Sequence, residues 1–193
     1  MLLTITGPSA SGKTSLARAL ITRIQGSTMM QSVTTREARP SDLHGEYEYV
    51  SPEQFAEIET AGSFLWTVDV YGNRYGTRKE AASSAAEENG IVFAILTVAA
   101  TKTLHAYLKE IGKEEEIQSV YLDIADEDLL RMRLQKRGDT KESIDLRIEQ
   151  SRTWAEERDQ SGLPYIIYDA GDDSDYLAEK VLTVLRKKGK LQN

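Results

Sequence analysis

The feature that most constrains this chain is an eight-residue segment of the pattern Gly-x-x-x-x-Gly-Lys-Thr, formed by Gly7, Pro8, Ser9, Ala10, Ser11, Gly12, Lys13 and Thr14. Such a pattern is meaningful as a phosphate-binding loop only where it follows a strand and opens a helix. Residues 2–6 are apolar and β-branched, which predicts a buried strand. Residues 14–25 place apolar side chains on one helical face. The segment therefore predicts a site for nucleotide phosphates.

Each part of this segment suits a bound polyphosphate. Glycines allow backbone N–H groups to face inward toward an anion, and the amino end of the following helix adds partial positive charge. We expect Lys13 to reach the β- and γ-phosphates and the Thr14 hydroxyl to bind the metal. The alternative is a Gly/Ser-rich turn between two core elements. We predict ATP and Mg²⁺ as cofactors, with all eight residues contacting ATP.

Strand-like and helix-like segments alternate along the whole chain. We expect strands at residues 2–6, 27–35, 46–50, 63–70, 91–97, 119–123 and 164–168, and a turn at residues 71–76. We expect helices at residues 14–25, 52–60, 78–88, 101–111, 126–137, 142–158 and 176–187. This alternation predicts the α/β class, with a doubly wound, mostly parallel sheet covered by helices on both faces. Residues 32–77 are strand-rich with short connections, which predicts a small inserted lobe.

Charge and composition narrow the partners. The chain of 193 residues has a net charge of −7, from 31 acidic and 24 basic residues, whereas nucleic-acid binding normally requires a basic face. It has no apolar run of about 18 residues, no secretory signal pattern and no cysteine. We expect a cytoplasmic monomer or homodimer that binds a small phosphorylated acceptor, without a nucleic-acid or membrane partner.

A second group of phosphate-binding side chains follows the first helix. Arg36 and Arg39 lie three residues apart, and arginine binds phosphate through paired hydrogen bonds. Two arginines in a loop are otherwise a solvated surface feature. The segment Ser-x-Thr-Thr-Arg-x-x-Arg at residues 32–39, with a tyrosine at position 47, is followed by Gly-Asn-x-Tyr-Gly-Thr at residues 72–77 and Arg-Leu-x-x-Arg-Gly at residues 133–138. With the phosphate loop, this order of segments resembles the guanylate kinase family over nearly the whole chain.

The resemblance implies one domain, residues 1–193, with three functional parts: a core of residues 1–31 and 78–193, an acceptor-binding lobe of residues 32–77, and a lid of residues 131–150. It implies that the acceptor phosphate is held by Arg36, Arg39, Tyr47 and Tyr75, and that Ser32 and Thr77 touch the acceptor base. It also implies that transfer is catalysed by Lys13, Arg133, Arg137 and Arg147. Arginines stabilise the charge that develops during phosphoryl transfer; the alternative is a solvated helix face paired with nearby acids.

The chain departs from the family pattern at the acceptor base. Trp66 stands where the family has a glutamate, and Leu96, Thr97 and Val98 stand where it has an acidic pair. Asp42 replaces another glutamate, and the spacing before Tyr47 is one residue shorter. Loss of polar groups that read a base edge weakens discrimination. We therefore expect an altered or weakened preference for guanine, and we expect Trp154 to pack in the core or the lid.

Three functions follow, and the first is favoured. It is a nucleoside monophosphate kinase that transfers the γ-phosphoryl group of Mg-ATP to GMP, dGMP or a related nucleotide. The second is a sugar-phosphate kinase resembling ribose bisphosphate phosphokinase. The third is a non-catalytic guanylate-kinase-like binding module, which the intact phosphate loop disfavours.

Overall fold

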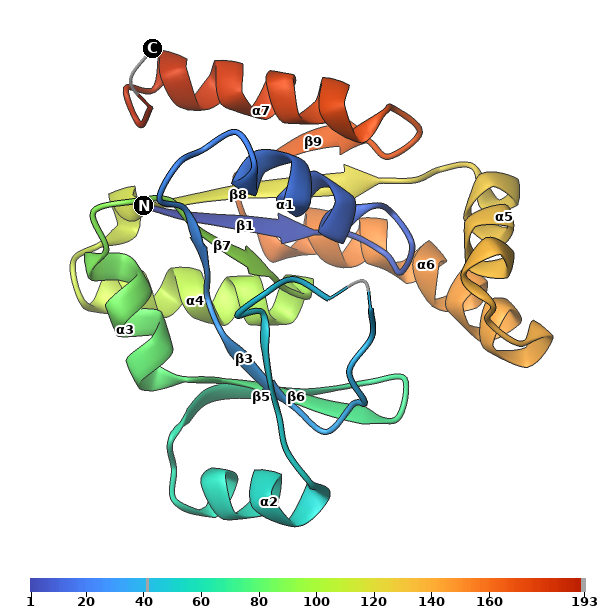
Figure 1. Cartoon of the computed structure of the whole chain (residues 1–193), viewed down its shortest axis with the longest axis horizontal. Helices are drawn as coiled ribbons and strands as arrows, with labels where there is room; N and C mark the ends of the chain where they lie inside the picture. Colours follow the sequence, from blue (N-terminus) through green and yellow to red (C-terminus); the bar gives the residue numbers. More distant parts are fainter. Residues whose placement is uncertain (41, 192–193) are drawn as a thin grey trace.

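The computed structural model, which describes residues 1–40 and 42–191, is built around a parallel sheet (Figure 1). Its five strands lie in the order β2-β7-β1-β8-β9, and all neighbours are parallel. They are β1 (Leu2–Thr6), β2 (Thr28–Met29), β7 (Val92–Ile95), β8 (Ile117–Asp123) and β9 (Tyr165–Asp169). The central strand β1 is buried along its whole length, as its apolar sequence predicts. The predicted α/β class is confirmed.

Helices cover both faces of this sheet. Figure 1 shows α1 (Lys13–Ile21) and α7 (Ser174–Lys187) on one side, and α3 (Lys79–Glu87) and α4 (Val98–Glu110) on the other. Leu16 of α1 and Leu104 of α4 are both completely buried, in two separate apolar clusters. Full burial of such a side chain contributes about 1.5–3 kcal/mol. The two clusters therefore pack on opposite faces of the main sheet.

A second, smaller sheet comes entirely from residues 32–78. Its order is β4-β3-β6-β5, formed by β3 (Ser32–Thr34), β4 (Tyr47–Tyr49), β5 (Phe64–Val70) and β6 (Asn73–Arg78). Helix α2 (Pro52–Thr60) packs on one face through Phe55, whose ring centre lies 4.7 Å from that of Phe64. The helix starts at a capping box, in which Ser51 and Gln54 each bind the backbone N–H of the other. This packing leaves the other face of the sheet for the cavity.

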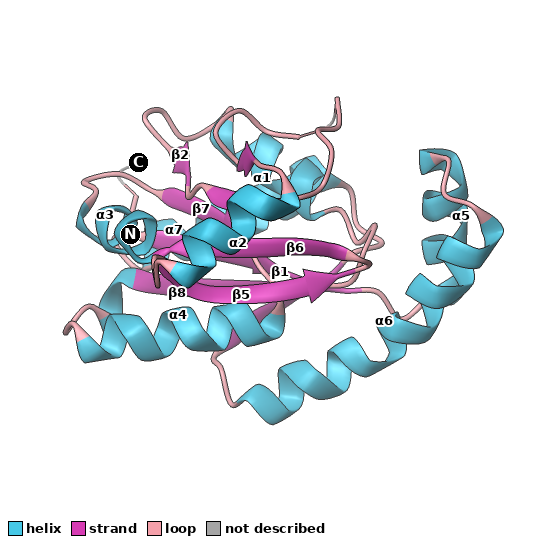
Figure 2. Ribbon diagram, turned by 90° about the horizontal axis from the view of Figure 1, so that it is seen from below, coloured by secondary structure: helices cyan, strands magenta, loops and turns pink. Residues whose placement is uncertain are grey.

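Helices α5 (Glu127–Arg137) and α6 (Lys141–Ser161) form a hairpin that projects beyond the main sheet (Figure 2). Gly138 ends α5 with a φ of 88°, and Thr140 caps α6 by accepting from the Ser143 amide. Leu134 and Ile148 are buried and belong to the same cluster as α1 and α7. One apolar stripe therefore ties the hairpin to the core.

Three local predictions were wrong. The turn predicted at residues 71–76 contains only Tyr71 and Gly72, because Asn73 already pairs with Val70 in the β5–β6 ladder. Tyr71 has a φ of 52°, a conformation that costs a non-glycine residue about 1–2 kcal/mol. Residues 27–35 divide into β2 and β3, which lie in different sheets. Finally, β7 ends before Thr97, whose side chain instead caps α4 by accepting from the Ala100 amide.

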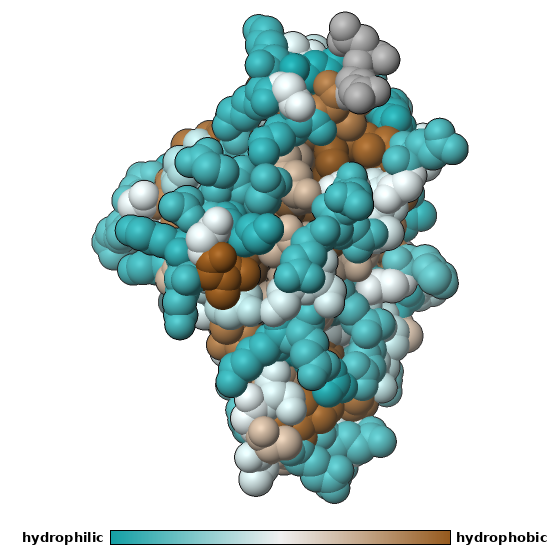
Figure 3. Space-filling view, turned by 90° about the vertical axis from the view of Figure 1, so that its left-hand side faces the viewer, coloured by the Kyte–Doolittle hydropathy of each residue, from teal (hydrophilic) through white to brown (hydrophobic). Residues whose placement is uncertain are grey.

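One face of the molecule is mostly hydrophilic. From the side at which β1 begins, hydrophilic side chains cover most of the molecule and hydrophobic ones occur in small groups (Figure 3). In the described part of the chain, no helix combines the length and the apolar character that crossing a membrane would require.

Candidate active site

A cavity of about 840 Å³ opens where β1 and β7 end, between the main sheet, the second sheet and the α5–α6 hairpin. This volume is in the range of small-ligand sites. The carboxyl end of a parallel sheet is the usual place for such a site. Among the residues predicted from sequence, only Gly7 and Pro8 are outside its lining. The cavity is lined by Ser9, Ala10, Ser11, Gly12, Lys13, Thr14, Ser32, Arg36, Arg39, Tyr47, Tyr75, Thr77, Arg133, Arg137 and Arg147.

The loop after β1 has the backbone of an anion-binding turn. Gly7 and Gly12 have φ values of 149° and 97°. A Cβ on Gly7 would lie 2.5 Å from the Leu122 carbonyl oxygen, so a side chain does not fit there. Lys13 Nζ donates to the carbonyl oxygens of Gly7 and Pro8, at 2.7 and 2.6 Å. Lys13 is therefore folded back on its own loop and must turn outward to meet a phosphate.

Lys13 has an unusual electrostatic environment. Its pKa is lowered to about 7, chiefly by burial and then by the charges of Arg137 and Arg147, which together outweigh the opposing effect of Glu46. The Trp154 ring lies beside the ammonium, with its centre 5.9 Å from Nζ. Trp154 lines the cavity, so the expectation that it only packs in the core or lid was incomplete. An anionic phosphate would restore the charged form of Lys13.

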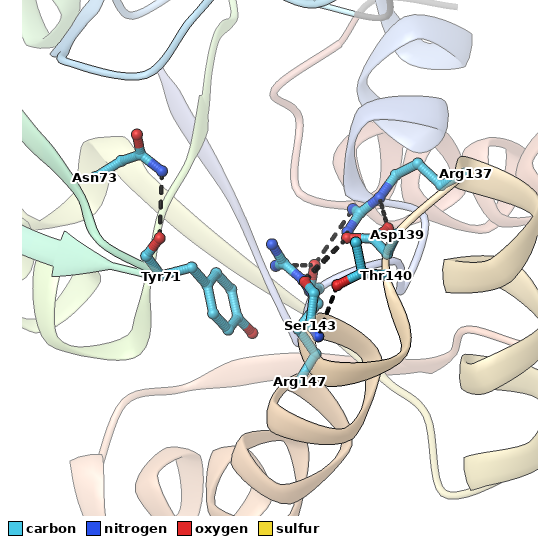
Figure 4. A network of polar contacts seen from close by, with 8 residues as sticks. Tyr71, Asn73, Arg137, Asp139, Thr140, Ser143 and Arg147 are labelled. Atoms are coloured by element: carbon cyan, nitrogen blue, oxygen red, sulfur yellow. Dashed lines mark hydrogen bonds and ion pairs between the residues drawn. The ribbon is translucent and has the colours of Figure 1, made fainter.

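Two arginines of the α5–α6 hairpin meet at the phosphate loop (Figure 4). Ser9 Oγ accepts from Arg137 Nη1 at 3.3 Å and from Arg147 Nη1 at 3.0 Å. Asp139 forms two hydrogen bonds with Arg137, at 2.6 and 2.8 Å, and lies 3.2 Å from Arg147 Nε. These ion pairs, led by the Arg137 hydrogen bonds, hold the pKa of Asp139 below its usual value. Asp139 neutralises both arginines at the place where phosphate charge would otherwise do so.

Arg133 and Thr14 also line the cavity, and they stand apart from the network around Asp139. Arg133 Nη1 is buried and makes no hydrogen bond to any described residue. A buried, unpaired cationic donor is costly unless an anion satisfies it. Thr14 offers a hydroxyl, and Mg²⁺ commonly combines one or two side-chain oxygens with waters and substrate phosphates. The residues present fit that mode, although the described residues contain no cluster of three metal-ligating side chains.

Arg36 is a buried arginine held by an acid and two rings. Its Nη2 lies 3.0 Å from both carboxylate oxygens of Asp42. Its guanidinium carbon lies 5.0 and 6.0 Å from the centres of the Tyr47 and Tyr49 rings. Burial alone would raise the pKa of Asp42, but hydrogen bonds from Tyr49, the Arg39 amide and Arg36 lower it overall. The arrangement fixes Arg36 before any ligand binds.

The cationic groups of the phosphate loop and of the Arg36–Arg39 segment affect one another, although the chain as a whole is acidic. The pKa of Arg39 is lowered by burial, and then by the charges of Arg36 and Arg137. Arg137 also lowers the pKa of Lys13. It therefore acts on both the phosphate loop and the Arg36–Arg39 segment, and the cavity has a local excess of cationic groups suited to phosphates.

Part of the cavity wall beside the second sheet is apolar. Ser32 Oγ and Thr77 Oγ1 lie 3.2 Å apart. Trp66 is the cross-strand neighbour of Thr77, and Leu96 belongs to the apolar cluster against which Trp66 packs. Both Trp66 and Leu96 line the cavity, whereas Val98 is buried at the start of α4 outside the lining. The hydroxyl pair of Ser32 and Thr77 thus lies beside an apolar wall formed by Trp66 and Leu96.

Several lining residues were missed by sequence reasoning. Tyr71 reaches the cavity from the β5–β6 turn, and Glu46 is a buried carboxylate that accepts from the Leu43 amide at 3.0 Å. Residues 170–174, between β9 and α7, line the opposite end. Asp139, which pairs with Arg137 and Arg147 but is outside the lining, was missed as well, although its place after Gly138 in the predicted helix break was a usable signal. Tyr71 and Glu46 carried none, because their roles depend on contacts between distant segments.

The comparisons with known proteins agree with this geometry. The sequence model of the guanylate kinase family matches residues 1–188. A guanylate kinase of Wolinella succinogenes is 37% identical over 149 residues, covering 76% of this chain and 67% of that protein. One from the Wolbachia of Brugia malayi is 30% identical over 192 residues, covering 97% of this chain and 93% of its own length.

The fold comparison is consistent with them. The crystal structure of a guanylate kinase from Anaplasma phagocytophilum superposes with a TM-score of 0.67 at 17% identity, covering 100% of this chain and 87% of that one. This likeness concerns the fold alone, and the sequence matches supply the family. The chain therefore belongs to the guanylate kinase family and is a phosphotransferase of the nucleoside monophosphate kinase type.

Proposed function

We propose that this protein transfers the γ-phosphoryl group of Mg-ATP to GMP or dGMP, producing ADP and the nucleoside diphosphate. The observation that carries the proposal is the position of Arg137, which donates to Ser9 of the phosphate loop and lines the same cavity as Lys13, Arg36 and Arg39. A residue between a donor-phosphate site and an acceptor-phosphate site is placed to stabilise a phosphoryl group that passes from one to the other.

The proposed reaction is a single displacement. A phosphate oxygen of the acceptor attacks the γ-phosphorus of ATP, the bond from that phosphorus to the β–γ bridging oxygen breaks, and ADP leaves with the bond electrons. Lys13 holds the β- and γ-phosphates, while Arg137 and Arg147 neutralise the equatorial oxygens. Mg²⁺, held through the Thr14 hydroxyl, supplies further charge neutralisation when bound. The phosphate loop, which runs from Gly7 to Thr14, would hold the donor phosphates, and its residues from Ser9 onward line the cavity.

In this proposal the acceptor phosphate binds Arg36 and Arg39, assisted by Tyr47 and Tyr75. The centres of the Tyr47 and Tyr75 rings lie 6.1 Å apart in an edge-to-face arrangement, and Arg36 lies over the Tyr47 ring. Residues 32–77 would then form the acceptor-binding lobe and residues 131–150 the lid, with Arg133 as a third lid arginine. The contacts of Arg137 and Arg147 with Ser9 support a lid that reaches the phosphate loop.

A relaxed choice of acceptor base is a second candidate, favoured by the wall of Trp66 and Leu96. Guanine presents neighbouring N–H donors whose hydrogen bonds a carboxylate would accept. Trp66 and Leu96 offer no carboxylate. Ser32 and Thr77 supply two hydroxyls, which serve as either donors or acceptors. Such a pair would accept more than one base edge.

A coupled ADP-release assay tests both candidates. Mg-ATP is offered with GMP, dGMP, AMP, the pyrimidine monophosphates and ribose 1,5-bisphosphate, and Lys13→Ala supplies the background. Turnover of GMP and dGMP at least tenfold above every other acceptor supports the first candidate and rejects the relaxed one. Comparable turnover of AMP supports the relaxed candidate. Turnover of ribose 1,5-bisphosphate alone would replace both with a sugar-phosphate kinase, and no ADP above background would remove the kinase proposal.

Two variants locate the base choice in the wall. Trp66→Glu places a carboxylate next to Thr77 and is expected to raise the ratio of kcat/KM for GMP over AMP by about tenfold or more. Trp66→Phe keeps the wall apolar and is expected to leave that ratio within about twofold of the unchanged protein. A ratio that moves equally in both variants would place base recognition elsewhere.

A further inference from the structure

Tyr71 makes the shortest of the cation–ring contacts in the described structure. The guanidinium carbon of Arg147 lies 3.7 Å from the centre of the Tyr71 ring. Figure 4 shows the Tyr71 side chain pointing from the β5–β6 turn toward Arg147 on α6. The residues are 76 positions apart (147 − 71), so the contact joins the second sheet to the α5–α6 hairpin.

The other sides of this guanidinium are also occupied. Arg147 Nε donates to Ser143 Oγ at 3.1 Å and lies 3.2 Å from Asp139, and Nη1 donates to Ser9 at 3.0 Å. The Tyr71 ring covers a face of the guanidinium that no hydrogen bond can hold. Only 9% of Arg147 is exposed. The ring thus adds to the contacts that shield Arg147 from solvent.

The backbone of Tyr71 is held in a strained form at this point. Its φ of 52° is in the left-handed region, and the described chain has one other non-glycine residue there, Ala10 of the phosphate loop. Asn73 Nδ2 donates to the Tyr71 carbonyl at 3.3 Å and stabilises the turn. Strain of this kind persists where surrounding contacts overcome it and is concentrated at functional sites. Here the stacking of the Tyr71 ring on the Arg147 guanidinium is such a contact.

We propose that Tyr71 is a positioning residue: its ring holds the Arg147 guanidinium against Ser9, so that the second sheet and the α5–α6 hairpin close over the phosphate loop together. The proposal rests on the proposed function, because Arg147 matters for transfer only if a phosphoryl group passes Ser9. Tyr71 itself touches no reacting atom in this scheme. In this scheme it acts by positioning Arg147.

A double-mutant cycle on kcat tests this dependence. Tyr71→Ala is expected to lower kcat about tenfold with less than a threefold change in KM for ATP, because a misaimed arginine loses transition-state contacts. Tyr71→Phe keeps the ring and is expected to restore kcat to within twofold. In an Arg147→Ala background, Tyr71→Ala is expected to have no further effect on kcat. Tyr176→Ala, an exposed tyrosine on α7, is the matched control.

A second double-mutant cycle, on thermal stability, tests the contact between Tyr71 and Arg147 without measuring catalysis. Melting temperatures of the ligand-free single and double variants are compared, and the stack predicts that the two single losses do not add. If unchanged protein fails to phosphorylate GMP, the proposed function fails while this cycle still reports the contact. If it does turn over and Tyr71→Ala lowers kcat equally with and without Arg147, the positioning role is rejected. Should Tyr71→Ala not fold, Tyr71→Gly removes the same ring, relieves the positive φ, and repeats both cycles.

Discussion

Lys13 Nζ lies 5.9 Å from the centre of the Trp154 ring and donates its hydrogen bonds to two carbonyls of its own loop, at Gly7 and Pro8. Burial and the charges of Arg137 and Arg147 lower the pKa of Lys13, and Glu46 opposes them only in part. In the free protein, the key cation of the phosphate loop is therefore held in a site that favours its neutral form.

Nucleotide binding is consequently expected to take up a proton at alkaline pH. The pKa of Lys13 in the free protein is about 7, so the side chain is charged below that pH and mostly neutral at pH 8.5. Bound phosphates raise the pKa again. Calorimetric titration with Mg-ATP in two buffers of different ionisation enthalpy is expected to show uptake approaching one proton at pH 8.5 and much less near pH 6.

The matched control is Lys13→Arg, whose guanidinium stays charged across this range. It is expected to abolish the uptake at pH 8.5. The same shift makes the folded protein gain stability as pH rises from 7 toward 10.5, since the unfolded chain holds the Lys13 proton over that interval. Equal proton uptake by the two proteins would contradict this account of Lys13.

The Arg36–Asp42 pair is expected to contribute stability that is lost in acid. The folded pKa of Asp42 is lowered, so its stabilisation is present above its unfolded pKa near 4 and disappears as pH falls through the folded value. Asp42→Asn is expected to cost about 1–2 kcal/mol at pH 7. Urea unfolding at pH 7 and pH 3.5 should therefore show a smaller acid loss in Asp42→Asn than in unchanged protein. Parallel losses would mean that Asp42 is not paired in solution.

Gly76 offers a test of the second sheet that leaves the phosphate loop untouched. A Cβ at this position would lie 2.8 Å from two ring atoms of Phe64, which itself packs on Phe55. Gly76→Ala is expected to lower the free energy of unfolding by about 1–3 kcal/mol. It should also raise KM for the acceptor, since Tyr75 and Thr77 flank it, while KM for ATP stays within about twofold.

Thr67→Ala is the control for this variant, because Thr67 is the cross-strand neighbour of Gly76 but is exposed. It should change neither KM. If Gly76→Ala raised both KM values alike, the acceptor and donor sites would not be separable in the way proposed here.

Much of the fold and most of the proposed site could be predicted from sequence, for local physical reasons. The phosphate loop is a short segment whose glycines, lysine and threonine carry the chemistry themselves, and the strand before it is apolar throughout. Arg36, Arg39 and Arg137 were identified through the order of segments that the chain shares with the guanylate kinase family, because charge alone does not separate them from surface arginines. Every one of these three lines the cavity.

The rest depended on contacts that have no local signature. Tyr71 was placed inside a turn, yet its importance comes from Arg147, which lies on a helix far along the chain. Trp154 was expected to pack in the core or the lid, and its place beside Lys13 depends on a contact between α6 and the distant phosphate loop. Thr97 continued an apolar strand in the sequence, but its hydroxyl made it the cap of α4.

The most direct test of the central claim is to identify both products. The protein is incubated with Mg-ATP and GMP, and ATP, ADP, GMP and GDP are separated by ion-exchange chromatography over time. We predict that GDP and ADP appear in equal amounts, and that Lys13→Ala slows their formation by at least about a hundredfold. ADP without GDP, or GDP formation unaffected by Lys13→Ala, would contradict transfer through the phosphate loop to GMP.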